Sequence, residues 1–287
     1  MAKPISADFI KELQSGIVKR LRAYVEEHDT LNMELRGNRV QVFYRGEIIL
    51  KVHEIGYSLI PLNEKYRSDD LMIPSPVDIQ EYMPLAMNAI DVYIEQDQNH
   101  LEKQNRLQEI VRANNYSENS LDTDYFVIDM RHQEQKLSFD LIALRWSAKS
   151  TDKPVISLIK VLENCKTKKS QDKLLSYINK TNDFVSKEEN TERVTALKEK
   201  MLGVFQQKRE LGLVRNLGPD CGIGKLNELA DEIEVAFVLT NQNSTCETLS
   251  HFVNTLSEEE YIHIKPKFIR LESDNYGLYT RNQVSME

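Results

Sequence analysis

The sequence predicts a mixed α/β protein, in which a strand-rich N-terminal part precedes a core of sheet and helices. Three apolar segments rich in β-branched and aromatic residues follow one another closely, at Tyr125–Arg131, Leu137–Trp146 and Pro154–Leu162. Two long segments with helical apolar spacing come next, and then a fourth apolar run, Glu234–Thr240. Strands followed by helices around a polar centre indicate a layered α/β architecture.

The first 75 residues have the pattern of a helix followed by an antiparallel β-meander. Apolar residues at helical spacing predict one helix over Ala7–His28. Gly37-Asn38 and Arg45-Gly46 are typical of tight turns. They separate short apolar runs at Leu31–Leu35, Val40–Tyr44, Ile48–Ile55 and Tyr57–Leu62. We therefore expect a separate antiparallel sheet, backed by the N-terminal helix.

Residues 76–287 are predicted to form the core domain. Ser75-Pro76-Val77-Asp78 is typical of a helix start, and apolar spacing extends this helix to about Asn114, with a kink or restart at Pro84. We expect the part near 85–113 to pack on one face of the central sheet. The remaining predicted elements are helices over Ser170–Val185, Thr191–Leu211 and Cys246–Leu256, and a strand over Lys267–Leu271.

Composition favours a globular protein of the cytoplasm. The 287 residues are 40% hydrophobic and 29% charged, which fits an ordinary apolar core. No apolar run approaches the length that spans a membrane, and the N-terminus lacks the apolar core of a secretory signal. Cys165, Cys221 and Cys246 are widely spaced with no Cys-x-x-Cys pair. They are therefore interpreted as reduced thiols, and a structural zinc site is not expected.

Charge is distributed unevenly along the chain. The formal net charge is −8, yet the segment from Arg131 to Lys187 holds 12 Lys/Arg against 6 Asp/Glu, a net of +6 that leaves −14 for the rest. A basic centre in an acidic chain could contact phosphates, although a solvated lysine-bearing helix face would give the same pattern. If nucleic acid binds, we expect contributions from Lys166, Lys168, Lys169 and Lys173 through counterion release.

Several short segments carry a resemblance to a known family. They are Leu31–Arg36, Val42–Gly46, Glu102–Asn105, Arg112–Asn115, Thr123–Asp129, Phe139–Leu144 and Val155–Leu162, spread over about two thirds of the chain. In these segments the chain resembles the PD-(D/E)XK nuclease superfamily, in particular a bacterial family with a strand-rich segment before the nuclease core. The resemblance implies a restriction-endonuclease-like mixed sheet flanked by helices.

The same resemblance implies a magnesium site. The superfamily places an aspartate on the second core strand, an acidic residue on the third, a lysine two residues later, and often a glutamate on the preceding helix. Asp140 matches the aspartate, and Glu102 is the candidate on the helix. Such carboxylates suit Mg²⁺, which prefers oxygen ligands and would activate water for phosphodiester cleavage.

The chain departs from this pattern on two strands. The third strand reads Leu158-Ile159-Lys160-Val161-Leu162, so Lys160 stands at the acidic position and Leu162 at the lysine position. The first strand carries Asp129-Met130-Arg131 where an Asp-x-Glu pattern would be expected. Cations in place of carboxylates repel a divalent ion. We therefore expect Lys160 to neutralise Asp140 across neighbouring strands.

Three hypotheses follow for function. In the first, the chain is a pseudo-nuclease without metal-dependent cleavage or a cofactor, which binds nucleic acid such as DNA, or a protein partner. In the second, it is a Mg²⁺-dependent DNA nuclease with relocated catalytic residues. Glu163, Asp129, Lys166 and Lys169 are the relocation candidates, although Glu163 has the wrong strand parity and needs a bulge to face inward. In the third, it is an unrelated regulatory or interaction domain. The catalytic candidates are Asp140, Lys160 and Glu163.

Overall fold

The computed structural model describes residues 3–16, 18–54, 59–61, 79–96, 102–116, 123–134, 137–146, 153–162, 168–214, 226, 228–240, 266–271 and 276–283. The chain divides into two compact units, which are described separately. The N-terminal unit comprises Ala2–Arg112 and Gly203–Arg215, and the core unit comprises Ala113–Leu202 and Asn216–Glu287. The predicted division between residues 75 and 76 lies outside the described residues.

The N-terminal unit contains a four-stranded antiparallel sheet with the strand order β1-β2-β3-β4. Its strands are β1 (Leu31–Leu35), β2 (Arg39–Tyr44), β3 (Glu47–His53) and β4 (Leu59–Pro61). The predicted β-meander is therefore confirmed. Arg45 and Gly46, between β2 and β3, both have positive φ, 48° and 78°. A two-residue hairpin turn that follows the strand twist requires this conformation, which explains the glycine.

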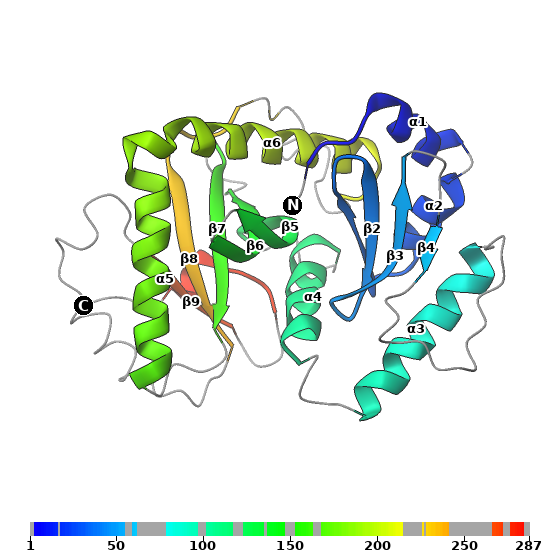
Figure 1. Ribbon diagram of the computed structural model, residues 1–287, viewed down its shortest axis with the longest axis horizontal. Coiled ribbons are helices and arrows are strands. Elements are labelled where there is room, and N and C mark those ends of the chain that lie inside the picture. Colours follow the sequence, from blue (N-terminus) through cyan, green and yellow to red (C-terminus); the bar gives the residue numbers. More distant parts are fainter. Residues whose placement is uncertain are drawn as a thin grey trace. The chain divides into compact units, whose positions relative to one another are not determined.

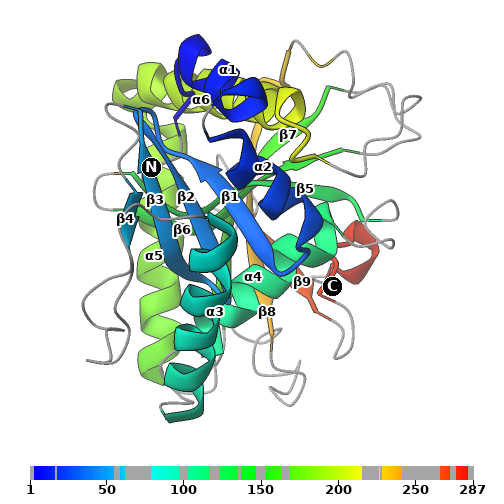
Figure 2. The same ribbon diagram turned by 90° about the vertical axis from the view of Figure 1, so that its right-hand side faces the viewer.

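The predicted N-terminal helix is two helices, α1 (Ala7–Ser15) and α2 (Lys19–Glu27). The prediction of one continuous helix was wrong because Gly16 leaves the helical conformation, with φ −90° and ψ −156°. A side chain at this position would overlap Glu12, so the sharp exit depends on glycine. α2 lies beside β1 (Figure 2), and the two helices bury Phe9, Ile10, Leu13, Leu21 and Val25.

The long helix predicted after residue 75 is also two helices, α3 (Ile79–Gln96) and α4 (Glu102–Asn115). The predicted start signal at residues 75–78 lies outside the described residues, and α3 continues through Pro84 without restarting. The buried Tyr82 donates its hydroxyl to the Ile49 carbonyl of β3 at 2.6 Å. α3 therefore packs on the N-terminal sheet, and for this helix the prediction of packing on the central sheet was wrong. At the end of α4, Asn115 Nδ2 donates to the Val127 carbonyl at 2.7 Å, and Asn115 Oδ1 accepts from the Val127 N–H at 2.9 Å.

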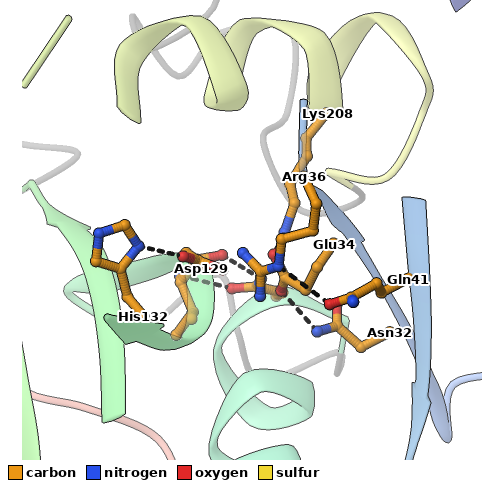
Figure 3. Close-up of polar contacts among 9 residues, drawn as sticks. Asn32, Glu34, Arg36, Gln41, Asp129, His132 and Lys208 are labelled. Carbon is orange, nitrogen blue, oxygen red and sulfur yellow. Dashed lines mark hydrogen bonds and ion pairs between the residues drawn. The ribbon is translucent and has the colours of Figure 1, made fainter. Parts of the chain in front are cut away.

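A buried ion pair joins distant parts of the N-terminal unit (Figure 3). Lys208 lies near the end of α6 (Thr191–Glu210), and its Nζ is 3.0 Å from Glu34 Oε2 on β1. The two side chains are 1% and 0% exposed. Asn32 Nδ2 donates to Glu34 Oε1 at 2.8 Å, and Arg36 Nε donates to Gln41 Oε1 at 3.2 Å. The Lys208–Glu34 pair holds the Gly203–Arg215 segment against a strand some 170 residues earlier in the chain.

The core unit is built on a five-stranded mixed sheet with the order β5-β6-β7-β8-β9 (Figure 1). The strands are β5 (Tyr125–Glu134), β6 (Leu137–Arg145), β7 (Val155–Leu162), β8 (Ile233–Leu239) and β9 (Lys267–Arg270). β5, β6 and β7 are antiparallel, whereas β8 runs parallel to β7 and β9 parallel to β8. The predicted α/β class, the pairing of the first three strands and the addition of the fourth are confirmed.

The described part of the connection between the parallel strands β7 and β8 contains two long α-helices, because a parallel pair cannot be joined by a tight turn. They are α5 (Lys168–Ser186) and α6, close to their predicted bounds. Leu174, Ile178 and Phe184 of α5 are buried, and Tyr177 meets Phe237 of β8 edge to face at 6.0 Å. Figure 1 shows α5 running alongside the sheet next to β7 and β8.

Two remaining predictions concern the C-terminal part and the membrane. The strand predicted over Lys267–Leu271 is present as β9, whereas the helix predicted over Cys246–Leu256 lies outside the described residues. Within the described ranges, every helix is too short or too polar to cross a membrane.

Candidate functional site

The strand register of the core sheet brings Asp140 and Lys160 together. Leu141 of β6 is the register partner of Ile159 of β7. Asp140 precedes Leu141 and Lys160 follows Ile159, so the two charged residues stand opposite each other on antiparallel strands. Lys160 Nζ lies 3.2 Å from Asp140 Oδ1, and their side chains are 19% and 12% exposed. The predicted pairing of these two residues is confirmed.

Both carboxylate oxygens of Asp140 accept hydrogen bonds. Lys160 donates to Oδ1, and the backbone N–H of Val161 donates to Oδ2 at 2.9 Å. Lys160 Nζ also donates to the carbonyl oxygen and the Oγ of Ser138, at 3.1 and 3.3 Å. The ammonium is therefore fixed by three oxygen acceptors from one strand.

Tyr177 of α5 also contacts the Lys160 ammonium. Its ring centroid lies 5.2 Å from Lys160 Nζ, within the range of a cation–π contact, and its hydroxyl donates to the Ser138 carbonyl at 2.8 Å. Burial, and then the charge of Asp140, raise the pKa of the Tyr177 hydroxyl well above its usual value. Tyr177 therefore remains a neutral hydrogen-bond donor at physiological pH.

The first strand places a second cation beside Asp140 in the register. Arg131 lies between Met130 and His132, which are the partners of Leu141 and Phe139. Its φ of +59° shows that β5 is irregular here, after a register shift between Val127 and Asp129. Counted along the strands, Arg131 and Lys160 therefore stand at the positions on either side of Asp140, and Arg131 is exposed.

Asp129, a candidate for a relocated catalytic residue, is engaged elsewhere. Its Oδ2 lies 2.6 Å from His132 Nδ1, and both side chains are fully buried (Figure 3). A fully buried carboxylate held by a histidine on the same strand cannot reach a substrate without local rearrangement. In this conformation the Asp129 carboxylate is therefore held in buried polar contacts.

The other predicted residues lie partly outside the described part of the chain. Glu163 and Lys166 fall outside it. Glu102 lies in α4, and Lys168 and Lys169 lie in α5, but the structure describes only their backbone. Lys173 is exposed on α5 and lines a pocket beside Tyr177.

The described residues around Asp140 do not fit Mg²⁺. That ion needs several oxygen ligands in near-octahedral geometry. Asp140 is already engaged by an ammonium and an amide, and its register neighbours are cations. Across the described ranges, no three His, Cys, Asp or Glu side chains are grouped as a metal site requires.

A second polar cluster crosses the core sheet and was not predicted. Glu234 of β8 is 4% exposed and accepts from the Tyr125 hydroxyl at 2.7 Å and from Ser157 Oγ at 3.0 Å. Arg145 Nε and Lys267 Nζ each lie 2.5 Å from its Oε2. Each of the five strands of the core sheet thus contributes one residue to this cluster. Burial, and then the Glu234 charge, raise the pKa of Tyr125 well above its usual value.

The Glu234 cluster lies on the sheet face opposite the Asp140–Lys160 pair. Side chains alternate along a strand, Arg145 is five residues from Asp140 on β6, and Ser157 is three residues from Lys160 on β7. These odd separations put the two sets on opposite faces. In the sequence, the recurrence of polar residues inside successive apolar strands is the signal that could have indicated this cluster. Which of these residues contact each other depends on the strand register.

Comparisons of the chain with protein-family models, with curated proteins and with solved structures find no match.

Proposed function

We propose that the chain is a nuclease-like protein that binds nucleic acid without metal-dependent cleavage. The observation that carries this proposal is the engagement of Asp140 by Lys160 and by the Val161 amide. The strand order of the core sheet supports it, because β5, β6 and β7 are antiparallel and β8 is added in parallel. The resemblance implies a mixed sheet with Asp140 on its second strand, and it did not specify the direction of each strand.

The chemistry of an ammonium group explains why binding would survive while cleavage is lost. An ammonium has no vacant coordination position and cannot lower the pKa of a bound water as a metal does. It can, however, attract a phosphate as a point charge. Lys160 therefore replaces part of the electrostatic role of a metal at Asp140 but not its role in generating a nucleophile.

Rebuilding the superfamily pattern is expected to create a metal site. The double variant Lys160→Glu with Leu162→Lys restores a carboxylate opposite Asp140 and a lysine two residues later, on the same strand face. We expect isothermal titration calorimetry to detect Mn²⁺ binding by this variant, and no Mn²⁺ binding at Asp140 in the wild type. Leu162 is half-buried at the end of β7, so a lysine there can extend to solvent.

Two controls make this metal test decisive. Lys160→Met removes the cation without adding a ligand and should bind no Mn²⁺. Asp140→Ala in the rebuilt background should abolish the gained binding. Wild-type Mn²⁺ binding that disappears in Asp140→Ala, together with DNA cleavage in Mg²⁺, would reject the proposal in favour of a nuclease with relocated residues.

Nucleic-acid binding is expected to depend steeply on salt. Replacing Lys166, Lys168, Lys169 and Lys173 together with glutamine should weaken the binding of a labelled DNA duplex. It should also reduce the slope of log affinity against log salt by about 3–4, because each phosphate contact contributes about 0.9 to that slope. Fluorescence anisotropy over a series of KCl concentrations measures both quantities.

A matched quadruple variant of exposed lysines elsewhere controls for the change in net charge. Lys3, Lys11, Lys153 and Lys187 are exposed, and the last three pair with nearby acidic residues. Their replacement with glutamine should leave the salt slope close to that of the wild type. Equal effects of the two variants would assign binding to overall charge, and no binding by the wild type would favour the interaction-domain hypothesis.

A further inference from the structure

A pocket lies between the beginning of β6 and one face of α5 in the core unit. Its volume is about 410 Å³, at the small end of the range of about 300–1,000 Å³ for ligand sites. Leu137 and Ser138 line it from β6, and Ser176 and Tyr177 line it from α5. Ser138 and Tyr177 also contact Lys160, so the pocket borders the Asp140–Lys160 pair.

The α5 wall presents a regular polar stripe. Lys173, Ser176, Tyr177 and Lys180 follow at helical spacings of three, four and seven residues, which places them on one face. The lysines stand about 10 Å apart along the helix axis, at 1.5 Å rise per residue. Ser176 lies between them. This spacing suits a ligand larger than a single small ion.

The positive and negative charges of the pocket lining do not cancel. Among the described residues, neither Lys173 nor Lys180 forms an ion pair, whereas Lys187, just beyond α5, lies 2.9 Å from Asp183. Asp172 is the single acidic residue of the pocket lining, so the lining carries a net charge of +1. The pocket is therefore electropositive within a chain whose net charge is −8.

Hydroxyl groups supply further donors beside these cations. Ser138 Oγ accepts a hydrogen bond from Lys160 Nζ at 3.3 Å, which leaves its own hydroxyl hydrogen for another acceptor. Ser176 is exposed on the opposite wall. Ammonium and hydroxyl donors together are the groups that bind the oxygens of an anion.

We infer that this pocket binds a phosphomonoester of mononucleotide size. A phosphomonoester offers three acceptor oxygens and close to two negative charges at neutral pH, which matches two lysines and two hydroxyls better than a carboxylate does. The Leu137 side chain and the Tyr177 ring provide apolar surface for the organic part of the ligand. The ligand is a free mononucleotide or the 5′-phosphorylated end of a strand.

This inference goes beyond the proposed function, since it requires neither a nuclease ancestry nor the loss of a metal. Only the strand-end form of the ligand rests on the proposed nucleic-acid binding. The experiment therefore uses four probes: AMP, adenosine, and a short single-stranded oligonucleotide with either a 5′-phosphate or a 5′-hydroxyl. Isothermal titration calorimetry of the full chain at low salt measures each affinity.

We expect AMP to bind at least about tenfold more tightly than adenosine, because only AMP carries the charged phosphate that the pocket lysines attract. The Lys173→Gln and Lys180→Gln double variant should weaken AMP binding by about tenfold or more. Ser176→Phe, which fills the pocket without changing its charge, should weaken it as well. Both lysines and Ser176 are exposed, so these substitutions leave the folded core intact. The matched control, Lys153→Gln with Lys187→Gln, should bind AMP as the wild type does.

The outcomes separate this inference from the proposed function. AMP binding that depends on the pocket lysines supports the inference, even if neither oligonucleotide binds and the proposed function fails. Oligonucleotides that bind equally with either 5′ end would support the proposed function and rule out the strand end as the ligand, so that the inference then rests on AMP alone. Equal affinities for AMP and adenosine, or AMP affinity unchanged in the double variant, would also overturn it.

Discussion

Replacing Lys208 with methionine is expected to lower the free energy of unfolding by about 3–5 kcal/mol, the usual effect of removing one partner from a buried ion pair. The Glu34 carboxylate is 0% exposed and Lys208 Nζ lies 3.0 Å from it. Without the ammonium, the buried Glu34 carboxylate loses the cation that lies 3.0 Å from it, and the neutral Asn32 amide that donates to its other oxygen carries no charge. Urea denaturation followed by circular dichroism measures the change.

Two further variants test whether the lost charge causes this effect. Adding Glu34→Gln to Lys208→Met removes the buried charge while keeping the side-chain volume, so the double variant should be more stable than Lys208→Met alone. Lys187→Met removes an exposed lysine from its ion pair with Asp183 and should leave the unfolding midpoint unchanged. A double variant that is less stable than Lys208→Met would show that packing of the lysine stem, not charge, determines the loss.

Gly46→Ala should destabilise the N-terminal unit by about 2–5 kcal/mol, which is the sum of the cost of a left-handed backbone conformation for alanine and the cost of an overpacked contact. Gly46 has φ +78° in the turn between β2 and β3, and its N–H donates to Gln108 Oε1 at 2.8 Å. A Cβ here would overlap the main-chain carbonyl of Gln104 on α4. Because a main-chain carbonyl in a helix cannot rotate away, the turn and α4 would have to separate.

Gly37→Ala is the matched control for this prediction. Gly37 has nearly the same conformation, with φ +77°, but a Cβ there would meet only the flexible Lys3 side chain, at 3.1 Å. Its replacement should cost about 1–2 kcal/mol, the backbone contribution alone. Thermal unfolding of both variants gives the difference, and equal losses would show that the close approach of the turn to α4 contributes nothing.

The sequence by itself determined those features that depend on neighbours along the chain. Apolar runs and turn residues between them predict β1–β4 and β5–β7, since strands joined by short loops pair with each other. The Asp140–Lys160 pair was predictable for the same reason, because short loops allow few registers between β6 and β7. α5 and α6 were predictable from their apolar periodicity.

Helix boundaries and packing partners were less predictable. Apolar residues continue at helical spacing over Ala7–His28, although the backbone leaves the helical conformation at Gly16. α3 has the apolar face of a core helix, but sequence periodicity does not say which sheet that face will contact. The hydrogen bond from the Tyr82 hydroxyl to the Ile49 carbonyl shows that α3 contacts the N-terminal sheet. This bond depends on the position of β3.

The contacts of the remaining polar groups were determined only by the tertiary structure. Glu34 and Lys208 are 174 residues apart, and Glu234 gathers partners from four other strands. The pocket at Ser138 and Lys180 likewise needs β6 and α5 to be in place. The local sequence shows the charge of each residue and the periodicity of its segment. It does not show the distance between two partners in the folded chain. That separation is set by the packing of the whole chain, because burial makes each polar group depend on a partner that the fold brings to it.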